Sequence, residues 1–316
     1  MTHPPEQLHA ACRRVVAVVN GKGGVLKTTT AANIAGQAAD AGHNVLLFDL
    51  DPQANLSEDL GITQAGTGGD AGAALFDAVA RGRELVPSHP QIRPRLDLVG
   101  ADPSNTKALV AWLTAHLVQP GGELALARVL APVAPRYDLV VFDLPPVLEE
   151  LRRIALAAAR YVLVPTQADI SSLKGMRLIA EQFMQARHVN PQLQLLGVLL
   201  VLVPESGTRI REDVRNAIAA DFGTAEPMFR TVIRHALSPA ESARKRGLLA
   251  HELESFVPTR QETFERLRQR AAGATVERAV SSTAVKLAAD WAGLTEEALT
   301  RIAEREAAEL AEGAER

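Results

Sequence analysis

Cysteine is nearly absent from this sequence of 316 residues, since Cys12 is the single one. One thiol excludes an intramolecular disulfide framework, and such usage is typical of a reducing compartment. No second thiol and no base lies close to Cys12 in the sequence, which favours a minor surface or packing role for it. We therefore expect a cytoplasmic protein that is held together by its hydrophobic core.

Long apolar segments and a strong charge bias are missing as well. No apolar run is long enough to span a bilayer, and Met1–Glu6 lacks the apolar core of a signal peptide. We therefore expect no membrane partner. The formal net charge is −3, so any attraction to nucleic acid has to come from a local basic patch.

A glycine-rich segment follows the apolar run Val15–Val19 and precedes a segment of helical composition that starts at Ala31. This order predicts a strand, a loop and a helix. Backbone N–H groups of such a loop and the positive end of the helix attract an anion. Lys27 can reach a terminal phosphate, and the Thr28 hydroxyl can ligate Mg²⁺. The predicted nucleotide-binding residues of this loop are Gly21, Lys22, Gly23, Gly24, Val25, Leu26, Lys27, Thr28 and Thr29.

Acidic residues end two further apolar runs. The run Asn44–Asp49 continues into Asp51, and the run Tyr137–Asp143 is followed by Pro145 and a second proline. The carboxyl ends of parallel strands face the ligand crevice of an α/β sheet. Carboxylates at these places can hold the water shell of Mg²⁺ or orient an attacking water, whereas either one alone could be a plain polar strand end.

The alternation of apolar runs with helical segments predicts an α/β fold. Right-handed βαβ units build a mostly parallel sheet covered by helices on both faces. We expect strands at residues 15–19, 44–49, 96–100, 137–143, 161–166 and 195–203. We expect helices at residues 73–80, 107–117, 123–130, 171–187, 275–291 and 295–310, and a surface loop at 64–72.

The string from Lys22 to Thr28 resembles the deviant Walker A motif, K-G-G-x-x-K-[ST], of the ParA/MinD family of P-loop ATPases. The segments around Asp49 and Asp143 resemble the D-x-D-P-Q and y-D-x-i-i-i-D-x-P-P motifs of that family. The resemblance covers roughly residues 14–270 and implies a P-loop fold with ATP and Mg²⁺ as cofactors. It divides the chain into a short N-terminal segment (1–13), an ATPase domain (14–272) and a C-terminal helical extension (273–316).

The resemblance also implies a role for individual residues. Lys22 is the signature lysine, which reaches across a homodimer to the nucleotide of the other subunit. Lys27 holds the β- and γ-phosphates, and Asp51 acts on the attacking water, so these three are the expected catalytic residues. The expected metal-site residues are Thr28, Asp49 and Asp143.

Other expected contacts lie in the second half of the chain. In the family, the loop after the strand at 195–203 packs on adenine, and here it contains Val203 and Pro204. Arg209 and Arg211 lie on one predicted helix, and Arg234 lies in a segment that is loosely similar to a DNA-contacting segment of the family. There, basic residues touch phosphates without reading sequence. A charge cluster of this kind can also be a solvated face.

One position departs from the P-loop pattern, because Leu26 stands where the second glycine is required. Glycine occupies such positions for a positive φ or for a close approach to a ligand. A leucine with φ > 0 would be strained by about 1–3 kcal/mol. We therefore expect helical φ/ψ angles at Leu26, a side chain turned away from the phosphates, and slow basal hydrolysis. A positive φ would instead favour a scaffold that scarcely hydrolyses ATP.

Taken together, the motifs are interpreted as those of a ParA-type partition ATPase. Such a protein forms an ATP-sandwich dimer, binds DNA non-specifically, associates with the nucleoid and hydrolyses ATP when a ParB-like centromere-binding protein stimulates it. Two alternatives stay open: a MinD-like positioning switch and a nucleotide-binding scaffold with little hydrolysis. MinD-like proteins end in a basic amphipathic helix, and the acidic end of this chain, Glu304–Glu315, argues against the first alternative.

Overall fold

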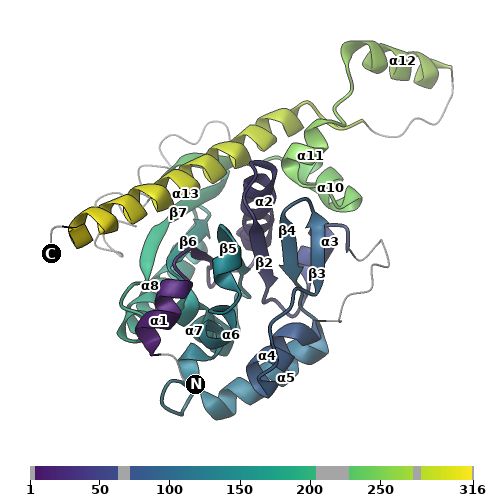
Figure 1. Ribbon diagram of the computed structural model, residues 1–316. Helices are drawn as coiled ribbons and strands as arrows, with labels where there is room; N and C mark the ends of the chain where they lie inside the picture. The colour runs from purple at the N-terminus through teal and green to yellow at the C-terminus, as the bar shows by residue number, and fades with distance from the viewer. Residues whose placement is uncertain (1–3, 63–71, 204–227, 273–278, 315–316) are drawn as a thin grey trace.

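The computed structural model describes residues 4–62, 72–203, 228–272 and 279–314. Its strands form one eight-stranded sheet in the order β3-β4-β2-β5-β1-β6-β7-β8 (Figure 1). They are β1 (Val15–Val18), β2 (Val45–Asp49), β3 (His89–Arg93), β4 (Leu96–Val99), β5 (Leu139–Asp143), β6 (Tyr161–Thr166), β7 (Gln194–Val203) and β8 (Met228–Arg234). Every neighbouring pair is parallel except β3–β4, which confirms the predicted fold class.

The central strands are buried on both faces, as their nearly continuous apolar sequences indicate. Along β1, Val15 and Ala17 belong to one apolar cluster, whereas Val16 and Val18 belong to the other. Side chains of a strand alternate between its two faces. The sheet therefore separates two cores, and each of them needs its own layer of helices.

Helices cover both faces of the sheet (Figure 1). The first core is closed by α1 (Pro5–Ala11), α4 (Ala73–Arg81), α5 (Pro103–His116), α6 (Ala125–Leu130), α7 (Glu149–Ala158) and α8 (Ile170–Val189). The second core is closed by α2 (Lys27–Asp40), α3 (Asn55–Asp59), α11 (Ala250–Glu254) and α13 (Thr283–Ala314). Along the chain, α10 (Leu237–Arg246) precedes α11, and α12 (Arg260–Ala271), which buries no residue and projects from the body, follows it (Figure 1).

The sequence analysis did not predict the two edge strands, β3 and β8. The side chains of β3 are half-exposed or exposed, and its sequence contains no apolar run. The strand pairs antiparallel with β4. β8 carries arginines among its apolar residues, and we interpreted that stretch as basic. An edge strand has one unpaired side, so its residues need not be uniformly apolar, and the pattern that reveals a central strand is lost.

The C-terminal region corrects a second prediction, because α13 is one helix of 32 residues instead of two. The predicted break at residues 292–294 includes Gly293, yet Leu294 is fully buried. Thr295 bonds through its hydroxyl to the Trp291 carbonyl (3.0 Å), so its polar group is satisfied inside the helix. The helix presents one buried stripe to the sheet, formed by Leu287, Trp291, Leu294, Ala298 and Ile302. Burial along this stripe outweighs the poor helix propensity of one glycine.

Candidate nucleotide-binding site

The glycine-rich loop joins β1 to α2 at the carboxyl end of the central strand, where open α/β sheets bind ligands. Gly24 has a φ of 76°, a conformation that glycine adopts without strain. The first turn of α2 closes directly after the loop, because the Thr30 N–H donates to the Leu26 carbonyl (2.8 Å). The N–H groups at this helix start are thus positioned to bind an anion.

Leu26 contradicts the expectation of helical angles. Its φ is 58° and its ψ is 30°, in the left-handed region, and it is the residue that precedes the first turn of α2. The chain has to reverse here from loop to helix, so the backbone keeps a conformation that glycine would adopt freely. The half-buried Leu26 side chain packs against the core on the α2–α13 face, and this packing offsets part of the strain.

The two lysines of the loop have different surroundings. The buried Lys27 Nζ donates to the Lys22 carbonyl (2.8 Å). Burial lowers the Lys27 pKa, and the nearby carboxylates of Asp143 and Asp51 counteract this effect. Lys22 instead extends to Asp169, and its Nζ lies 2.9 and 2.8 Å from the two carboxylate oxygens. The Lys22 and Asp169 side chains are 26% and 39% exposed, so a second molecule could reach this ion pair.

Asp49 and Asp143 face each other in register at the ends of β2 and β5. Each is 1% exposed, and Asp49 Oδ2 and both Asp143 carboxylate oxygens have no hydrogen-bond partner. Burial raises the pKa of both carboxyls. For Asp49, the charge of Asp143 adds to this rise; for Asp143, the nearby Thr28 hydroxyl partly offsets it. Buried carboxylates without partners fit a divalent cation that Thr28 would help to hold.

The same donor set argues for Mg²⁺ over a metal enclosed by protein. Within the described residues, no group of three or more His, Cys, Asp or Glu side chains is arranged to hold a metal ion. Mg²⁺ usually takes one or two carboxylates and completes its shell with waters and substrate phosphates. The two aspartates therefore suit a magnesium that arrives with a nucleotide.

Asp51 lies on the loop that follows β2. Its N–H donates to Asp49 Oδ1 (3.0 Å), and its own Oδ1 accepts from the Gln53 N–H (3.0 Å). The half-buried Asp51 carboxylate contributes to the electrostatics of Lys27 and Asp143, so it lies within their reach. The turn around Asp51 thus holds a third carboxylate at the mouth of the site.

Several supporting residues had no signal in the sequence. Asn20 accepts from the Lys22 N–H (3.0 Å) and donates to the Pro165 carbonyl (2.8 Å), which links the loop to β6. Gln167 donates to the Gly24 carbonyl (2.9 Å). A Cβ on Gly175 of α8 would lie 2.7 Å from Asn20 Oδ1, so only glycine allows this approach. The contacts of these three residues join parts of the chain that are far apart in the sequence. No local sequence pattern predicts such contacts.

The loop after Asp143 is held by a buried arginine. Arg152 of α7 is 4% exposed; its Nη1 donates to the Pro146 carbonyl (2.5 Å), and its Nε donates to Gln182 of α8 (3.0 Å). Burial lowers the Arg152 pKa, and Glu149 and Glu150 oppose this. The segment that follows Asp143 is therefore attached to α7 and α8.

Of the remaining predicted residues, the structure describes Val203 and Arg234. Val203 is buried at the end of β7, and its carbonyl accepts from the His235 N–H (3.1 Å). Pro204, Arg209 and Arg211 lie outside the described residues. The structure therefore tests neither the adenine loop beyond Val203 nor the first pair of DNA-contact arginines.

Arg234 holds a position that its sequence did not indicate. Its Nε and Nη2 lie 2.6 and 2.7 Å from the two carboxylate oxygens of Asp290 on α13, whose Oδ2 also accepts from the Arg234 N–H. This bidentate ion pair attaches α13 to β8. The predicted DNA contact by Arg234 stays untested, but its charge is largely compensated within the chain.

An apolar pocket of about 340 Å³ adjoins the loop on the α13 side. It lies between the start of α2, the ends of β7 and β8, and the helices α10, α11 and α13. Its apolar lining includes Leu26, Leu202, Ile233, Leu249, Leu287 and Trp291. A volume of this size is typical of small-ligand sites.

Comparison with known proteins identifies the family. A family model described as "AAA domain" matches residues 13–195. The chromosome-partitioning ATPase Soj of Thermus thermophilus is 38% identical over 242 residues, which cover 74% of this chain and 86% of that protein. This chain belongs to the ParA/Soj family of ATPases. The chromosome partitioning protein ParA of Myxococcus xanthus is 36% identical over 197 residues, and the match spans 61% of this chain and 66% of that relative.

Solved structures agree with the family assignment. Cobyrinic acid a,c-diamide synthase from Mycobacterium smegmatis, with bound ATP analog and magnesium, matches with a TM-score of 0.59 and 30% identity, and covers 74% of this chain and 92% of its own. The cell division ATPase MinD of Pyrococcus furiosus matches with a TM-score of 0.60 and covers 90% and 97% of the two chains. At 20% identity, that second likeness shows the shared fold. In the described part of this chain, no helix is both long and apolar enough to cross a bilayer.

Proposed function

We propose that this protein is a partition ATPase that closes an ATP-sandwich dimer, binds DNA non-specifically and is stimulated by a ParB-like partner. One observation carries the proposal: Lys27 meets the buried carboxylates of Asp49 and Asp143, three of whose four oxygens lack a hydrogen-bond partner, at the carboxyl ends of three adjacent strands. A cation and two buried carboxylates with open oxygens at a helix N-terminus suit a Mg²⁺–triphosphate. Asp51 then orients the attacking water, and the ATPase domain spans residues 14–272 with a helical extension at 273–316.

The dimer part of the proposal rests on Lys22. Its ion pair with Asp169 is half exposed, so a nucleotide of a second subunit could replace the carboxylate as its partner. Lys22→Ala should leave ATP binding by the monomer intact and abolish the ATP-dependent dimer. Calorimetry and size-exclusion chromatography with Mg-ATP test this, with Asp169→Asn as the control that removes the partner but keeps the lysine. An ATP-dependent dimer in Lys22→Ala would contradict the sandwich arrangement.

The DNA part rests on Arg209, Arg211 and Arg234. Arg234→Glu should weaken binding equally on unrelated sequences, because phosphate contacts carry no sequence information. The exchanged pair Arg234→Glu with Asp290→Arg separates this effect from damage to the fold. A swap variant that regains stability but not DNA binding makes Arg234 a DNA contact. Recovery of both would move the contact to Arg209 and Arg211.

A second function, a nucleotide-binding scaffold with little hydrolysis, is favoured by the left-handed Leu26. A bulky residue there limits how the loop can adjust around the phosphates during turnover. Single-turnover hydrolysis in the presence of DNA and a cognate ParB-like protein distinguishes the two. Stimulated turnover supports the partition ATPase, and stable ATP under the same conditions supports the scaffold.

A further inference from the structure

The apolar pocket beside the loop meets the phosphate-binding segment at two residues only among those described. Leu26 and Thr29 line the pocket, and they flank Lys27 and Thr28 in the sequence. The pocket therefore begins where the proposed phosphate site ends. The rest of its lining comes from later residues of α2, from Asp59 of α3, from the ends of β7 and β8, and from α10, α11 and α13.

Leu26 lies between Lys27 and the pocket lining, and its backbone has left-handed φ/ψ angles. Its left-handed φ of 58° is retained although a leucine is strained there, and its side chain is half-buried against the core of the pocket side. Leu202, at the end of β7, also has a positive φ (56°) and lines the same pocket. Strained backbone of this kind is concentrated at ligand sites, where the surrounding structure holds it in place.

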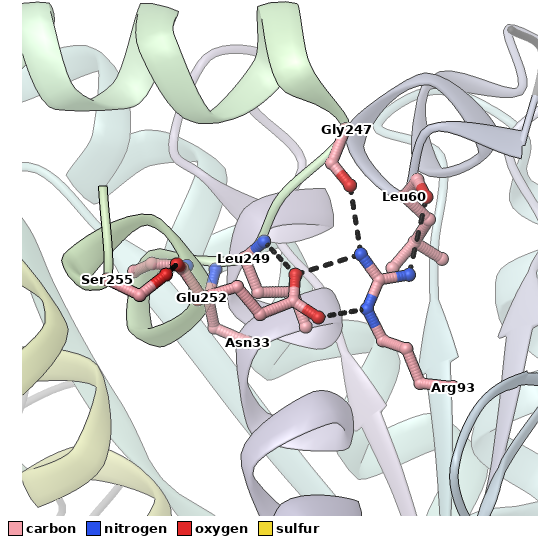
Figure 2. Close-up of polar contacts among 8 residues, drawn as sticks. Asn33, Leu60, Arg93, Gly247, Leu249, Glu252 and Ser255 are labelled. Atoms are coloured by element: carbon pink, nitrogen blue, oxygen red, sulfur yellow. Dashed lines mark hydrogen bonds and ion pairs between the residues drawn. The ribbon is translucent and has the colours of Figure 1, made fainter. Parts of the chain in front are cut away.

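Polar contacts fix α11 against its neighbours beside the pocket (Figure 2). Arg93 of β3 forms a bidentate ion pair with Glu252 of α11 (2.6 and 2.9 Å), and Glu252 accepts from the Leu249 N–H (2.6 Å). Asn33 bridges the Thr29 carbonyl on α2 and the Ala250 N–H on α11 (2.8 and 3.0 Å). These bonds hold α11 against α2 and β3, so the α2–α11 side of the pocket, to which Leu26 also belongs, is fixed.

We propose that the Leu26 side chain obstructs the passage from the phosphate loop to the apolar pocket, so that a nucleoside triphosphate binds only after Leu26 gives way. This inference rests on the proposed function, because it takes the loop to bind a triphosphate. The nucleoside is the bulky part of such a ligand, and the inference takes it to extend toward the pocket that Leu26 and Thr29 line. A ligand that must first shift an obstructing side chain binds with an affinity reduced by the fraction of open molecules.

The test compares Mg-ATP with Mg-tripolyphosphate, which has the phosphates but no nucleoside. Calorimetry on the full chain measures both ligands for the wild type, Leu26→Ala and Leu26→Gly. Alanine removes most of the side chain but keeps a Cβ in a left-handed backbone, whereas glycine also removes the strain. We expect both variants to bind ATP about tenfold or more tightly than the wild type, and Leu26→Ala to raise the affinity for ATP much more than the affinity for tripolyphosphate.

Leu237→Ala is the matched control, because Leu237 lines the same pocket from α10 and its side chain is exposed. It should not raise ATP affinity. Thermal melting of each variant verifies that the fold persists. Unchanged or weaker ATP binding by Leu26→Ala would overturn the obstruction. An equal gain for both ligands in Leu26→Gly alone would also overturn it, because relief of strain would then explain the result.

Failure of the inference and failure of the proposed function give different results. If the wild type binds ATP tightly and Leu26→Ala weakens this binding, the obstruction is refuted. The proposed function is not affected by that result. If no variant binds ATP or tripolyphosphate, the loop is not a triphosphate site, and both proposals fall. Lys27→Ala identifies specific binding, since it should remove the tripolyphosphate signal that Leu26→Ala retains.

Discussion

The phosphate loop and the α10–α13 region are held in place by different means. The loop, residues 19–26, is fixed by its own backbone and by polar side chains such as Asn20 and Gln167. By contrast, α13 is held by a buried apolar stripe and by arginines. Arg301, for example, donates to the carbonyls of Leu196 and Met228 (2.9 and 2.7 Å). Under the proposed function, ligand chemistry dictates residue identity in the first region, whereas the second only has to fill and cover the sheet.

This difference explains where sequence reasoning succeeded. An anion-binding loop needs particular residues at particular spacings, so a nine-residue string predicted its position between strand and helix. Packing of a covering helix tolerates many sequences, so no local pattern marked the continuity of α13, and the two separate helices predicted there are wrong. The comparison implies that substitutions in the loop should impair ligand binding more than stability. Substitutions in the buried stripe of α13 should impair stability more than ligand binding.

The largest effect is expected at Lys27. Lys27→Ala should abolish detectable ATP binding, because it removes the only buried cation of the loop while leaving two buried carboxylates to repel phosphate. Calorimetry measures the loss, and Lys107→Ala on the exposed side of α5 is the matched control. Unaltered ATP affinity would refute the site assignment.

A loss of turnover without a loss of binding is expected at Asp51. Asp51→Ala should lower hydrolysis by about 10²–10⁴-fold, the usual contribution of a positioned acid or base, and still allow an ATP-bound dimer. Stimulated hydrolysis and size-exclusion chromatography measure the two properties, with the exposed Glu304→Ala as control. If the dimer also disappears, Asp51 has a structural role.

Under α13, the effect should be on stability. Trp291 is 1% exposed, and Trp291→Ala should lower the free energy of unfolding by about 3–5 kcal/mol through the cavity it leaves. Chemical denaturation measures this change. Leu310→Ala on the same helix, where the side chain is 76% exposed, should alter stability little. Comparable losses from both variants would show that α13 is not anchored by its buried stripe.

The Arg234–Asp290 pair should contribute less than the tryptophan, because it is partly exposed. Arg234→Glu should cost about 1–3 kcal/mol, since a half-buried carboxylate loses its partner and meets a like charge. The exchanged pair should recover most of this loss in denaturant melts. Failure of the exchange to restore stability would mean that Arg234 acts through geometry that the swapped side chains cannot reproduce.

The smallest effect is a pH dependence at Asp59, which also lines the pocket. Burial raises the Asp59 pKa from 3.8 to about 6, and the Arg244 charge opposes this rise. A raised carboxyl pKa favours the folded state while the group is protonated, so its stabilising contribution falls as the pH rises from about 4 to about 6. Asp59→Asn should therefore gain stability relative to the wild type across this interval and hold the gain above it. A pH-independent difference between their melting temperatures would contradict the raised pKa.

The sequence by itself determined the α/β class, the positions of the six inner strands of the sheet and the place of the glycine-rich loop between β1 and α2, because two-sided burial and a strand–loop–helix order each leave a local pattern. It also located Asp49 and Asp143, and their pairing followed from the rule that parallel strands end at one edge. Only the tertiary structure decided the left-handed angles of Leu26, the edge strands β3 and β8, the continuity of α13 and the ion pair of Arg234. These features depend on partners far away in the chain, and free energy of packing, not local propensity, selects among the alternatives.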